Sequence, residues 1–413
     1  MLLYITIGFF LLIFSLPLSW SFGLSFIFHA VSFQFGSIDI SSFGFLILLL
    51  RLVILNKFKL LRLFRQYDTI RIFASILIVN IIWSISGGKN ALEFILANFR
   101  ILISLFIFAH FLSEIDNIKF WRKLVFIPIV LLLTHNYLLS NEIHPLYETL
   151  FEFGRLSGRT ITGEMLNSNQ AAYTIFVLLV IYYLFHLYRL NDDSKFKIHI
   201  LIFILIIFTF LISGSLGSRV VIFSLLLFSP ILYFQSKKII LFLGFTAILL
   251  GNFDFSNLNL PIIGENANER IRAINSEELS KDSEMSRNII FSNGIKIYSD
   301  NFLLGIGTGK ILETMQSSNY LGHTMMLHNV YLDLAVQFGL VGIFLILWIL
   351  FFGLRMFYSN LNLGFIYFIT IILPNFGHNF FLLSITPMSM VLIEFFAKKV
   401  IPKQLKVSGH DRP

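Results

Sequence analysis

His328 is the side chain of this sequence best suited to acid–base chemistry. It stands in the stretch MMLHNVYLD (residues 325–333), between the longest polar segment of the chain and an apolar run, with Asn329 next to it and Asp333 five residues on. A neutral imidazole, with its ordinary pKa of about 6.5, can take a proton from a hydroxyl group near neutral pH. The alternative is a histidine that caps a helix. Gly339 and Gly342 follow, and glycines permit close helix packing.

Four arginines have neighbours that suit the binding of a phosphate group. Arg219 follows the small residues SGSLGS (213–218), Arg155 and Arg159 lie in GRLSGRTITG (154–163), and Arg287 begins an amphipathic stretch. Arginine can bind phosphate oxygens through two parallel hydrogen bonds, and small neighbours let the backbone approach a ligand. The alternatives are structural: a snorkelling side chain at a helix end, a solvated surface arginine, or a turn-rich connector.

Two further charges lie inside apolar runs, where an ionisable group is a functional candidate by default. We expect Arg100 to face the interior of a helix bundle, whereas Glu394 is expected to pair with the basic residues near the C-terminus. The polar pair His378 and Asn379 is a further candidate for a wall of the site or for the membrane interface. No metal-binding motif is present, so we expect neither a metal ion nor a cofactor.

The composition requires lipid as the main solvent. Charged residues make up 13% of the 413 residues and hydrophobic residues 56%, with a mean hydropathy of +0.81, whereas soluble domains have roughly 25% charged residues. The net charge of +8 does not indicate nucleic acid, because the basic residues sit in short loops between apolar runs. The absence of cysteine excludes disulfides and a cysteine nucleophile.

The apolar runs predict an all-α, polytopic membrane protein with about twelve transmembrane helices. A spanning helix needs about 20 mostly apolar residues, and candidates run approximately over 2–18, 38–56, 69–87, 91–113, 121–139, 168–188, 197–214, 218–235, 238–252, 326–353, 363–380 and 383–398. With this count, lysine and arginine gather in loops on one side, which is then cytoplasmic, as are both termini. We expect a retained first helix rather than a signal peptide, and Phe22 to Phe35 could be an interfacial or re-entrant piece.

The predicted organisation has one large outer loop. Residues 1–252 would form a bundle of nine helices, 253–325 a periplasmic loop with short helices, 326–398 the last three helices, and 399–413 a cytoplasmic tail. Within the loop we expect a polar helix over 265–284, an amphipathic one over 286–299, and a flexible turn at GIGTG (305–309).

The order and spacing of these motifs resemble those of the O-antigen ligase/polymerase superfamily of bacterial membrane proteins. The motifs that carry the resemblance are Arg219 after its Ser/Gly turn, RNII (287–290), DNFLLGIG (300–307), HNVYL (328–332) and GLVG (339–342). The stretch from Arg155 to Asn169 resembles an earlier outer loop of that family, and the N-terminal third matches only in its hydropathy.

The resemblance implies a GT-C type glycosyltransferase that is inverting and metal-independent. Its donor would be an oligosaccharide on undecaprenyl pyrophosphate, used at the periplasmic face of the bacterial inner membrane. By that likeness Arg219 and Arg287 bind the pyrophosphate, and His328 serves the acceptor hydroxyl as base or positioner. Further substrate contacts would come from Arg155, Arg159 and Asn329. A flippase and a chain-length regulator of the same pathway are the expected partners.

Two activities occur in that superfamily, and the resemblance favours the first. A polymerase joins lipid-linked repeat units, whereas a ligase transfers the finished chain to lipid A-core. A polysaccharide flippase or another secondary transporter is the alternative from a different class. The single large outer loop and the lack of an internal repeat count against it.

Overall fold

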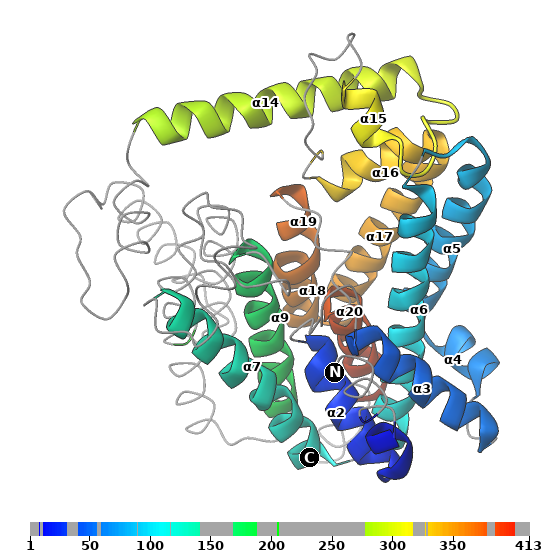
Figure 1. Cartoon of the computed structure of the whole chain (residues 1–413), viewed down its shortest axis with the longest axis vertical. Helices are drawn as coiled ribbons and strands as arrows, with labels where there is room; N and C mark the ends of the chain where they lie inside the picture. Colours follow the sequence, from blue (N-terminus) through cyan, green and yellow to red (C-terminus); the bar gives the residue numbers. More distant parts are fainter. Residues whose placement is uncertain are drawn as a thin grey trace, which may run out of the picture. The chain divides into compact units, whose positions relative to one another are not determined.

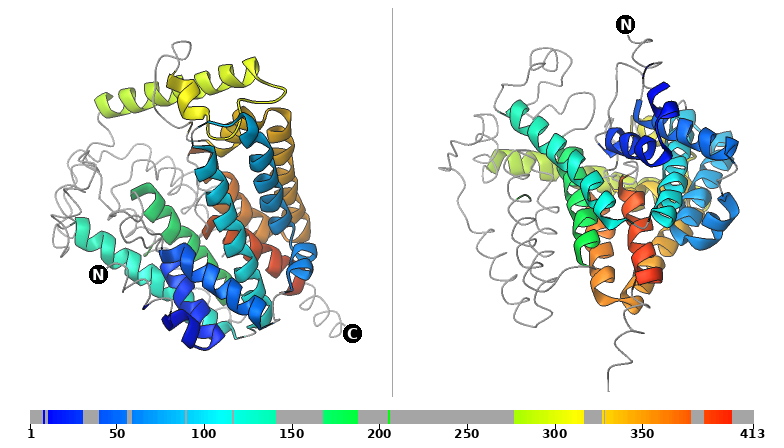
Figure 2. Two further views of the ribbon diagram at one scale, coloured as in Figure 1. Left: turned by 45° about the vertical axis from the view of Figure 1, so that its right-hand side comes forward. Right: turned by 90° about the horizontal axis from the view of Figure 1, so that it is seen from below.

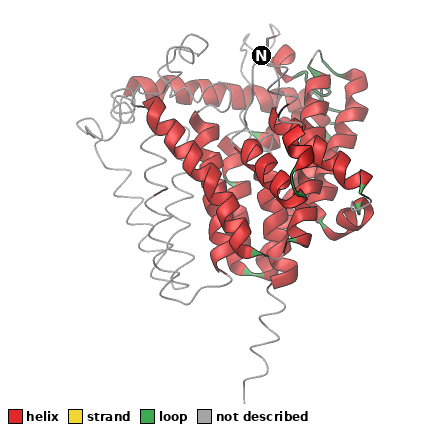
Figure 3. Ribbon diagram, turned by 60° about the horizontal axis from the view of Figure 1, so that its bottom comes forward, coloured by secondary structure: helices red, strands yellow, loops and turns green. Residues whose placement is uncertain are grey.

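Helices make up all the regular structure that can be described. The computed structural model describes residues 8, 11–30, 40–55, 59–88, 90–115, 117–140, 168–187, 205, 277–316, 327, 329–377 and 385–400. Within these ranges there is no strand (Figure 3), so the predicted all-α class is confirmed there. Figure 1 gives the labels of the helices.

Three helical segments in the described ranges are long and apolar enough to cross a membrane. They are Asp68–Ser86 (α5, Asp68–Trp83, with the 3₁₀ turn η1, Ser84–Ser86), α6 (Ala91–Glu114) and α17 (Leu340–Ser359). Shorter apolar helical segments cover Gly44–Ile54, Tyr173–Phe185 and Leu363–Phe376. The chain is therefore a membrane protein, while the count of twelve stays a prediction, since residues 197–252 lie almost wholly outside the described residues.

The chain divides into two compact units. Unit 1 comprises Met1–Phe58 and Phe111–Ser280, and unit 2 comprises Lys59–His110 and Lys281–Pro413. Each unit thus joins segments from distant parts of the sequence, and the division passes through α6 and through the first turn of the helix Glu277–Asp300 (α14).

Unit 1 packs its described helices around aromatic side chains. Its helices are α2 (Leu18–Ala30), α3 (Ile40–Ile54), α7 (Ile118–Ser140) and α9 (Ser168–Leu187), with α2 beside α3 and α7 beside α9. Phe22 stacks on Phe111 with ring centroids 4.3 Å apart, and Trp121 stacks on Phe185 at 5.5 Å. The sequence left the structure of the stretch from Phe22 to Phe35 open. Most of this stretch lies in α2, and Phe22 is buried.

The range of unit 2 includes three of the six predicted site residues, namely Arg287, His328 and Asn329. Unit 2 contains α5, α17 and most of α6. It also contains α4 (Leu60–Gln66), most of α14 (Glu277–Asp300), α15 (Ile311–Gln316), α16 (Val330–Phe338), α18 (Leu361–Tyr367), the π-helix η5 (Phe368–Ile372), α19 (Pro374–Gly377), α20 (Ile385–Phe395) and the π-helix η6 (Phe396–Val400). The helices α5 and α17 lie side by side (Figure 2).

The predicted span over 326–353 is wrong in one respect, because it is two helices. Gly339 takes a left-handed conformation (φ 57°), and its N–H donates to the Ala335 carbonyl at 2.8 Å, which closes α16 before α17 begins. A side chain at Gly342 would overlap the backbone of Leu334. The apolar run continues through this break, so hydropathy cannot reveal it.

The two helices expected in the large loop are also different from those observed. A single helix, α14, runs from Glu277 to Asp300, and residues 265–276 lie outside the described residues. Ile290 and Ile297 of α14 form a core with Ile311 and Met315 of α15, Leu327, and Val336 of α16. One continuous helix keeps Ile290 and Ile297, which are two turns apart, on the same face.

Glu394 is a completely buried carboxylate that fastens α20 to the start of α5. Its oxygens accept hydrogen bonds from the backbone N–H of Asp68 (2.7 Å) and Thr69 (3.1 Å) and from the Thr69 hydroxyl (2.9 Å). These N–H groups have no partner within α5, and a negative charge at a helix N-terminus is stabilised by the helix dipole. Lys398 forms an ion pair with Glu394, which confirms that this acid pairs near the C-terminus.

Basic residues from three helices meet around Asp68. Arg355 of α17 lies 2.9 Å from its carboxylate and Lys398 lies 3.6 Å away, and Arg71 also pairs with it. The pKa of the nearby Tyr67 phenol is raised, mainly by its burial and secondly by the negative charge of the Glu394 carboxylate. The start of α5, the end of α17 and the end of α20 therefore share one side of unit 2.

Replacing Glu394 with glutamine is expected to destabilise the protein by about 1–3 kcal/mol, because the amide has one acceptor oxygen where the carboxylate has two, so one of the N–H groups of Asp68 and Thr69 loses its partner. The measurement is the midpoint of thermal unfolding of the purified protein in detergent. Glu93→Gln, at an exposed position in the first turn of α6, is the control and is expected to change stability by less than about 0.5 kcal/mol. Equal midpoints for the two variants would contradict this account of Glu394.

Candidate functional site

The described part of the chain contains two of the six predicted site residues. Asn329 lies directly before α16, and Arg287 lies in α14, in a section for which the structure describes only the backbone. The other four, His328, Arg219, Arg155 and Arg159, lie outside the described residues, as do His378 and Asn379. Whether the arginines converge on His328 therefore stays a prediction.

Asn329 is the N-cap of α16. Its backbone is extended (φ −143°, ψ 111°), and its Oδ1 accepts a hydrogen bond from the N–H of Leu332 at 3.0 Å. An asparagine in this position satisfies one of the free N–H groups at a helix start. The cap fixes the point at which the chain enters α16, next to the position of His328, and this role was not anticipated from the sequence.

The glycine turn at 305–309 is fastened to the end of α16 rather than flexible, so that expectation was wrong. The N–H groups of Ile306 and Gly307 donate to the carbonyls of Val336 (3.0 Å) and Gln337 (3.1 Å), and the Gly309 N–H donates to Gln337 Oε1 (3.1 Å). Gly305, Gly307 and Gly309 all have positive φ, and a Cβ at Gly305 would overlap the Gln337 backbone. Glycine is needed here for conformation and close approach, not for mobility.

The same turn also holds the corner between α5 and α6. The Thr308 hydroxyl donates to the Asn80 carbonyl at 3.1 Å, the Gly88 N–H donates to the Thr308 carbonyl at 3.0 Å, and the Trp83 indole N–H donates to the Leu304 carbonyl. The turn thus joins two segments more than 200 positions apart in the sequence and places α16 against α5 and α6.

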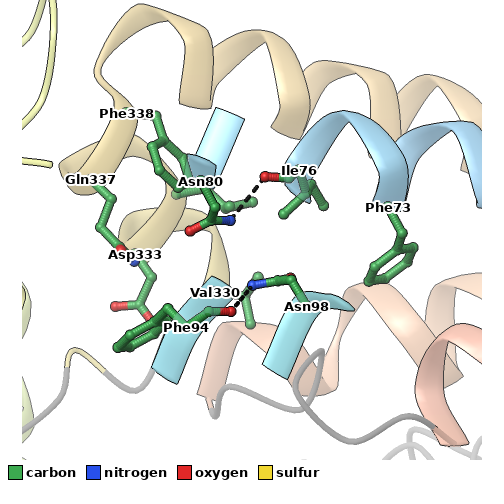
Figure 4. Close-up of a pocket in the computed structure, with 10 residues that line it drawn as sticks. Phe73, Ile76, Asn80, Phe94, Asn98, Val330, Asp333, Gln337 and Phe338 are labelled. Carbon is green, nitrogen blue, oxygen red and sulfur yellow. Dashed lines mark hydrogen bonds between the residues drawn. The ribbon is translucent and has the colours of Figure 1, made fainter. Parts of the chain in front are cut away.

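A cavity of about 50 Å³ lies between α5, α6 and α16 (Figure 4). Its apolar lining consists of Phe73, Ile76, Phe94, Val330, Leu334 and Phe338, and its polar lining of Asn80, Asn98, Asp333 and Gln337. Each of the four polar residues is at least 90% buried. Its lining, mostly apolar with a few polar groups, has the composition of a ligand site, and its volume is several times smaller than that of a site for a whole ligand.

The sequence singled out Asp333 but not Asn80, Asn98 or Gln337. The available signal was an asparagine inside each of two apolar spans, at Asn80 and Asn98, where polar residues are rare and face the protein interior. The same signal predicts that Arg100 faces the interior of the helix bundle, and this prediction is wrong, because Arg100 is exposed. Asn98 and Arg100 are two positions apart, about 200° around the helix, so a helix that turns Asn98 to the cavity turns Arg100 away.

Residues 201–347 match the family model described as O-antigen ligase. This match confirms the resemblance to the O-antigen ligase/polymerase superfamily. No curated protein matched the chain.

The matched segment includes Arg219, Arg287 and His328 together with α14, the glycine turn and α16. Arg155 and Arg159 lie before it. Of the cavity lining, α16 belongs to the matched segment, whereas Asn80 and Asn98 come from helices outside it. In the described part of the chain, no group of three or more His, Asp or Glu side chains is placed to hold a metal ion.

Proposed function

We propose that this protein is an O-antigen polymerase, a membrane glycosyltransferase that joins undecaprenyl-pyrophosphate-linked oligosaccharide repeat units. The observation that carries the proposal is the family match over 201–347, which contains both candidate pyrophosphate-binding arginines and the candidate base in one segment. The reaction takes place at the periplasmic face of the inner membrane, with both termini in the cytoplasm.

The proposed reaction is a direct displacement at the anomeric carbon of the donor sugar. A hydroxyl of the acceptor sugar forms the new C–O bond while the bond to the pyrophosphate oxygen breaks, which inverts the anomeric configuration. His328 accepts the hydroxyl proton, and undecaprenyl pyrophosphate leaves with the electron pair of the broken bond. Arg219 and Arg287 hold the pyrophosphate charge, so neither a protein nucleophile nor a metal ion is required.

The described helices support this arrangement, because the helix that contains Arg287 packs against the residues on either side of His328. Ile290 and Ile297 of α14, the helix of Arg287, share a core with Leu327 and with Val336 of α16. For a pyrophosphate and its sugar to bridge the site, each arginine must lie within about 15 Å of His328, or a groove must connect them.

An O-antigen ligase is the second candidate, because the matching family model carries that description. Such a ligase would use the same donor, the same arginines and the same base. It would differ in its acceptor, which would be lipid A-core instead of another lipid-linked repeat unit.

The test is a reaction with the purified protein and the undecaprenyl-pyrophosphate-linked repeat unit, with and without lipid A-core. A ladder of products from the repeat unit alone is expected, since a polymerase uses it as both donor and acceptor. A product that forms only with lipid A-core would replace the polymerase with the ligase. No product in either reaction would contradict both and favour a flippase.

A further inference from the structure

The asparagines of the cavity have unused hydrogen-bonding capacity. The Nδ2 of Asn80 donates to the Ile76 carbonyl and that of Asn98 to the Phe94 carbonyl, each at 2.9 Å (Figure 4). In each side chain these bonds use one N–H of an amide that has two N–H groups and a carbonyl oxygen. Polar groups that border a buried space are stabilised by water or by a ligand that completes their hydrogen bonds.

The charge of the lining selects the kind of ligand. Among the ten lining residues that the structure describes, Asp333 is the one ionisable residue, and none is lysine, arginine or histidine. A carboxylate repels pyrophosphate but accepts hydrogen bonds from hydroxyl groups, as the asparagine oxygens also do. The aromatic rings of Phe73, Phe94 and Phe338 provide an apolar wall. The cavity therefore suits a neutral ligand rich in hydroxyl groups, and its volume fits one edge of such a ligand.

The position of Asp333 relates the cavity to the proposed reaction. Asp333 lies four residues after the cap Asn329, to whose carbonyl its N–H donates at 2.9 Å. Four helical residues span about 6 Å along the axis. Val330, the first residue of α16, also lines the cavity, so the cavity extends from the end of α16 that adjoins His328 to Asp333 and beyond.

We propose that this cavity is the acceptor subsite, open to water from the outer side, where Asp333, Asn80 and Asn98 bind hydroxyl groups of the acceptor sugar. The proposal rests on the proposed glycosyltransferase function. It assigns the two substrates to surfaces of opposite charge: the arginines bind the pyrophosphate donor, and the carboxylate and amides orient the acceptor. Asp333 is accordingly a substrate-binding residue, distinct from the base His328.

Cysteine labelling tests whether the cavity is aqueous, and it does not depend on enzyme activity. The chain has no cysteine, so Asn98→Cys gives a single thiol without background. Spheroplasts are treated with small membrane-impermeant methanethiosulfonates, one cationic and one anionic. We expect Asn98→Cys to react with both reagents. The rate of each reagent is divided by its rate with Ser299→Cys, an exposed position on α14. After this normalisation the cationic reagent should react faster, because the Asp333 carboxylate attracts it.

Ser104→Cys is the matched buried control. Like Asn98, Ser104 is a buried residue of α6 that bonds to the carbonyl four residues earlier, but it is not part of the cavity lining. We expect it to stay unlabelled. If Asn98→Cys reacts no faster than Ser104→Cys, the cavity is closed and the proposal is overturned. Loss of the charge preference in the Asn98→Cys, Asp333→Asn double variant is expected.

Kinetics test whether the subsite takes the acceptor. The acceptor probe is the repeat-unit oligosaccharide on a simple alkyl chain, which lacks pyrophosphate and cannot act as a donor. Asp333→Asn is expected to raise the KM of this acceptor about tenfold and to leave the KM of the lipid-linked donor within about twofold, as for the loss of one hydrogen bond to a charged group. The Asn98→Leu variant should act in the same direction, and Ser104→Ala should change neither constant.

The outcomes separate this proposal from the proposed function. A wild-type protein that forms no product with any acceptor, lipid A-core included, contradicts the function and with it the acceptor subsite, even if the labelling shows an aqueous cavity. An active wild type whose acceptor KM is unchanged by Asp333→Asn overturns the subsite alone. Equal increases in the KM of donor and acceptor would also overturn it, because they would indicate a structural role.

Discussion

Replacement of His328 with alanine is expected to lower the rate of sugar transfer by a factor of about 10² to 10⁴, the usual contribution of a general base. The variant should still insert into the membrane at the wild-type level, since the position precedes the apolar run of α17 and adds nothing to it. The measurement is the initial rate of product formation from the lipid-linked repeat unit, at equal amounts of purified protein.

The control for His328 is His410→Ala, which removes a histidine from the predicted cytoplasmic tail. This variant should transfer sugars at the wild-type rate. A transporter or an assembly scaffold would tolerate the loss of His328. An unchanged rate of polymer formation in the His328→Ala variant would therefore remove the base from the proposed mechanism.

The second large effect is expected at the two arginines assigned to the pyrophosphate. Arg219→Ala and Arg287→Ala should each lower kcat/KM for the donor by a factor of about 10² to 10³, because a preorganised donor to the developing negative charge is lost. Arg219→Lys and Arg287→Lys should recover part of the activity, since lysine keeps the charge but not the two parallel hydrogen bonds. The measurement is kcat/KM for the lipid-linked donor at a saturating concentration of the acceptor.

Lys296→Ala is the matched control for Arg287. Lys296 is an exposed cation of the same helix, nine residues later, which is about two and a half turns and therefore the opposite face. The kcat/KM of the Lys296→Ala variant for the donor should stay within about twofold of the wild-type value, the range expected of a surface substitution. If Lys296→Ala and Arg287→Ala reduce kcat/KM equally, α14 contributes only general positive charge, and a specific pyrophosphate contact by Arg287 is excluded.

Helices formed by continuous apolar runs could be predicted closely from the sequence. The predicted spans over 69–87 and 91–113 correspond to Asp68–Ser86 and Ala91–Glu114, because a long apolar stretch in lipid must satisfy its own backbone hydrogen bonds and does so as a helix. The breaks within apolar runs were not predictable in this way. The break at Gly339 depends on the approach of Leu303, whose carbonyl accepts the Leu340 N–H at 3.2 Å, and that contact joins residues from the large loop and α17.

The sequence by itself predicted an all-helical membrane protein, and the structure confirms the all-helical class for the residues that it describes. The sequence also showed the resemblance to the O-antigen ligase/polymerase superfamily and the residue types that could do the chemistry. These are properties of local composition and of motif order, which need no knowledge of contacts. Only the tertiary structure decided that Asn329 caps α16, that the glycine turn is fastened to Gln337, and that Asn80, Asn98 and Asp333 border one cavity. The physical reason is that the direction in which a helix turns each side chain is set by the helices packed against it, and residues from distant segments meet only when that packing is complete.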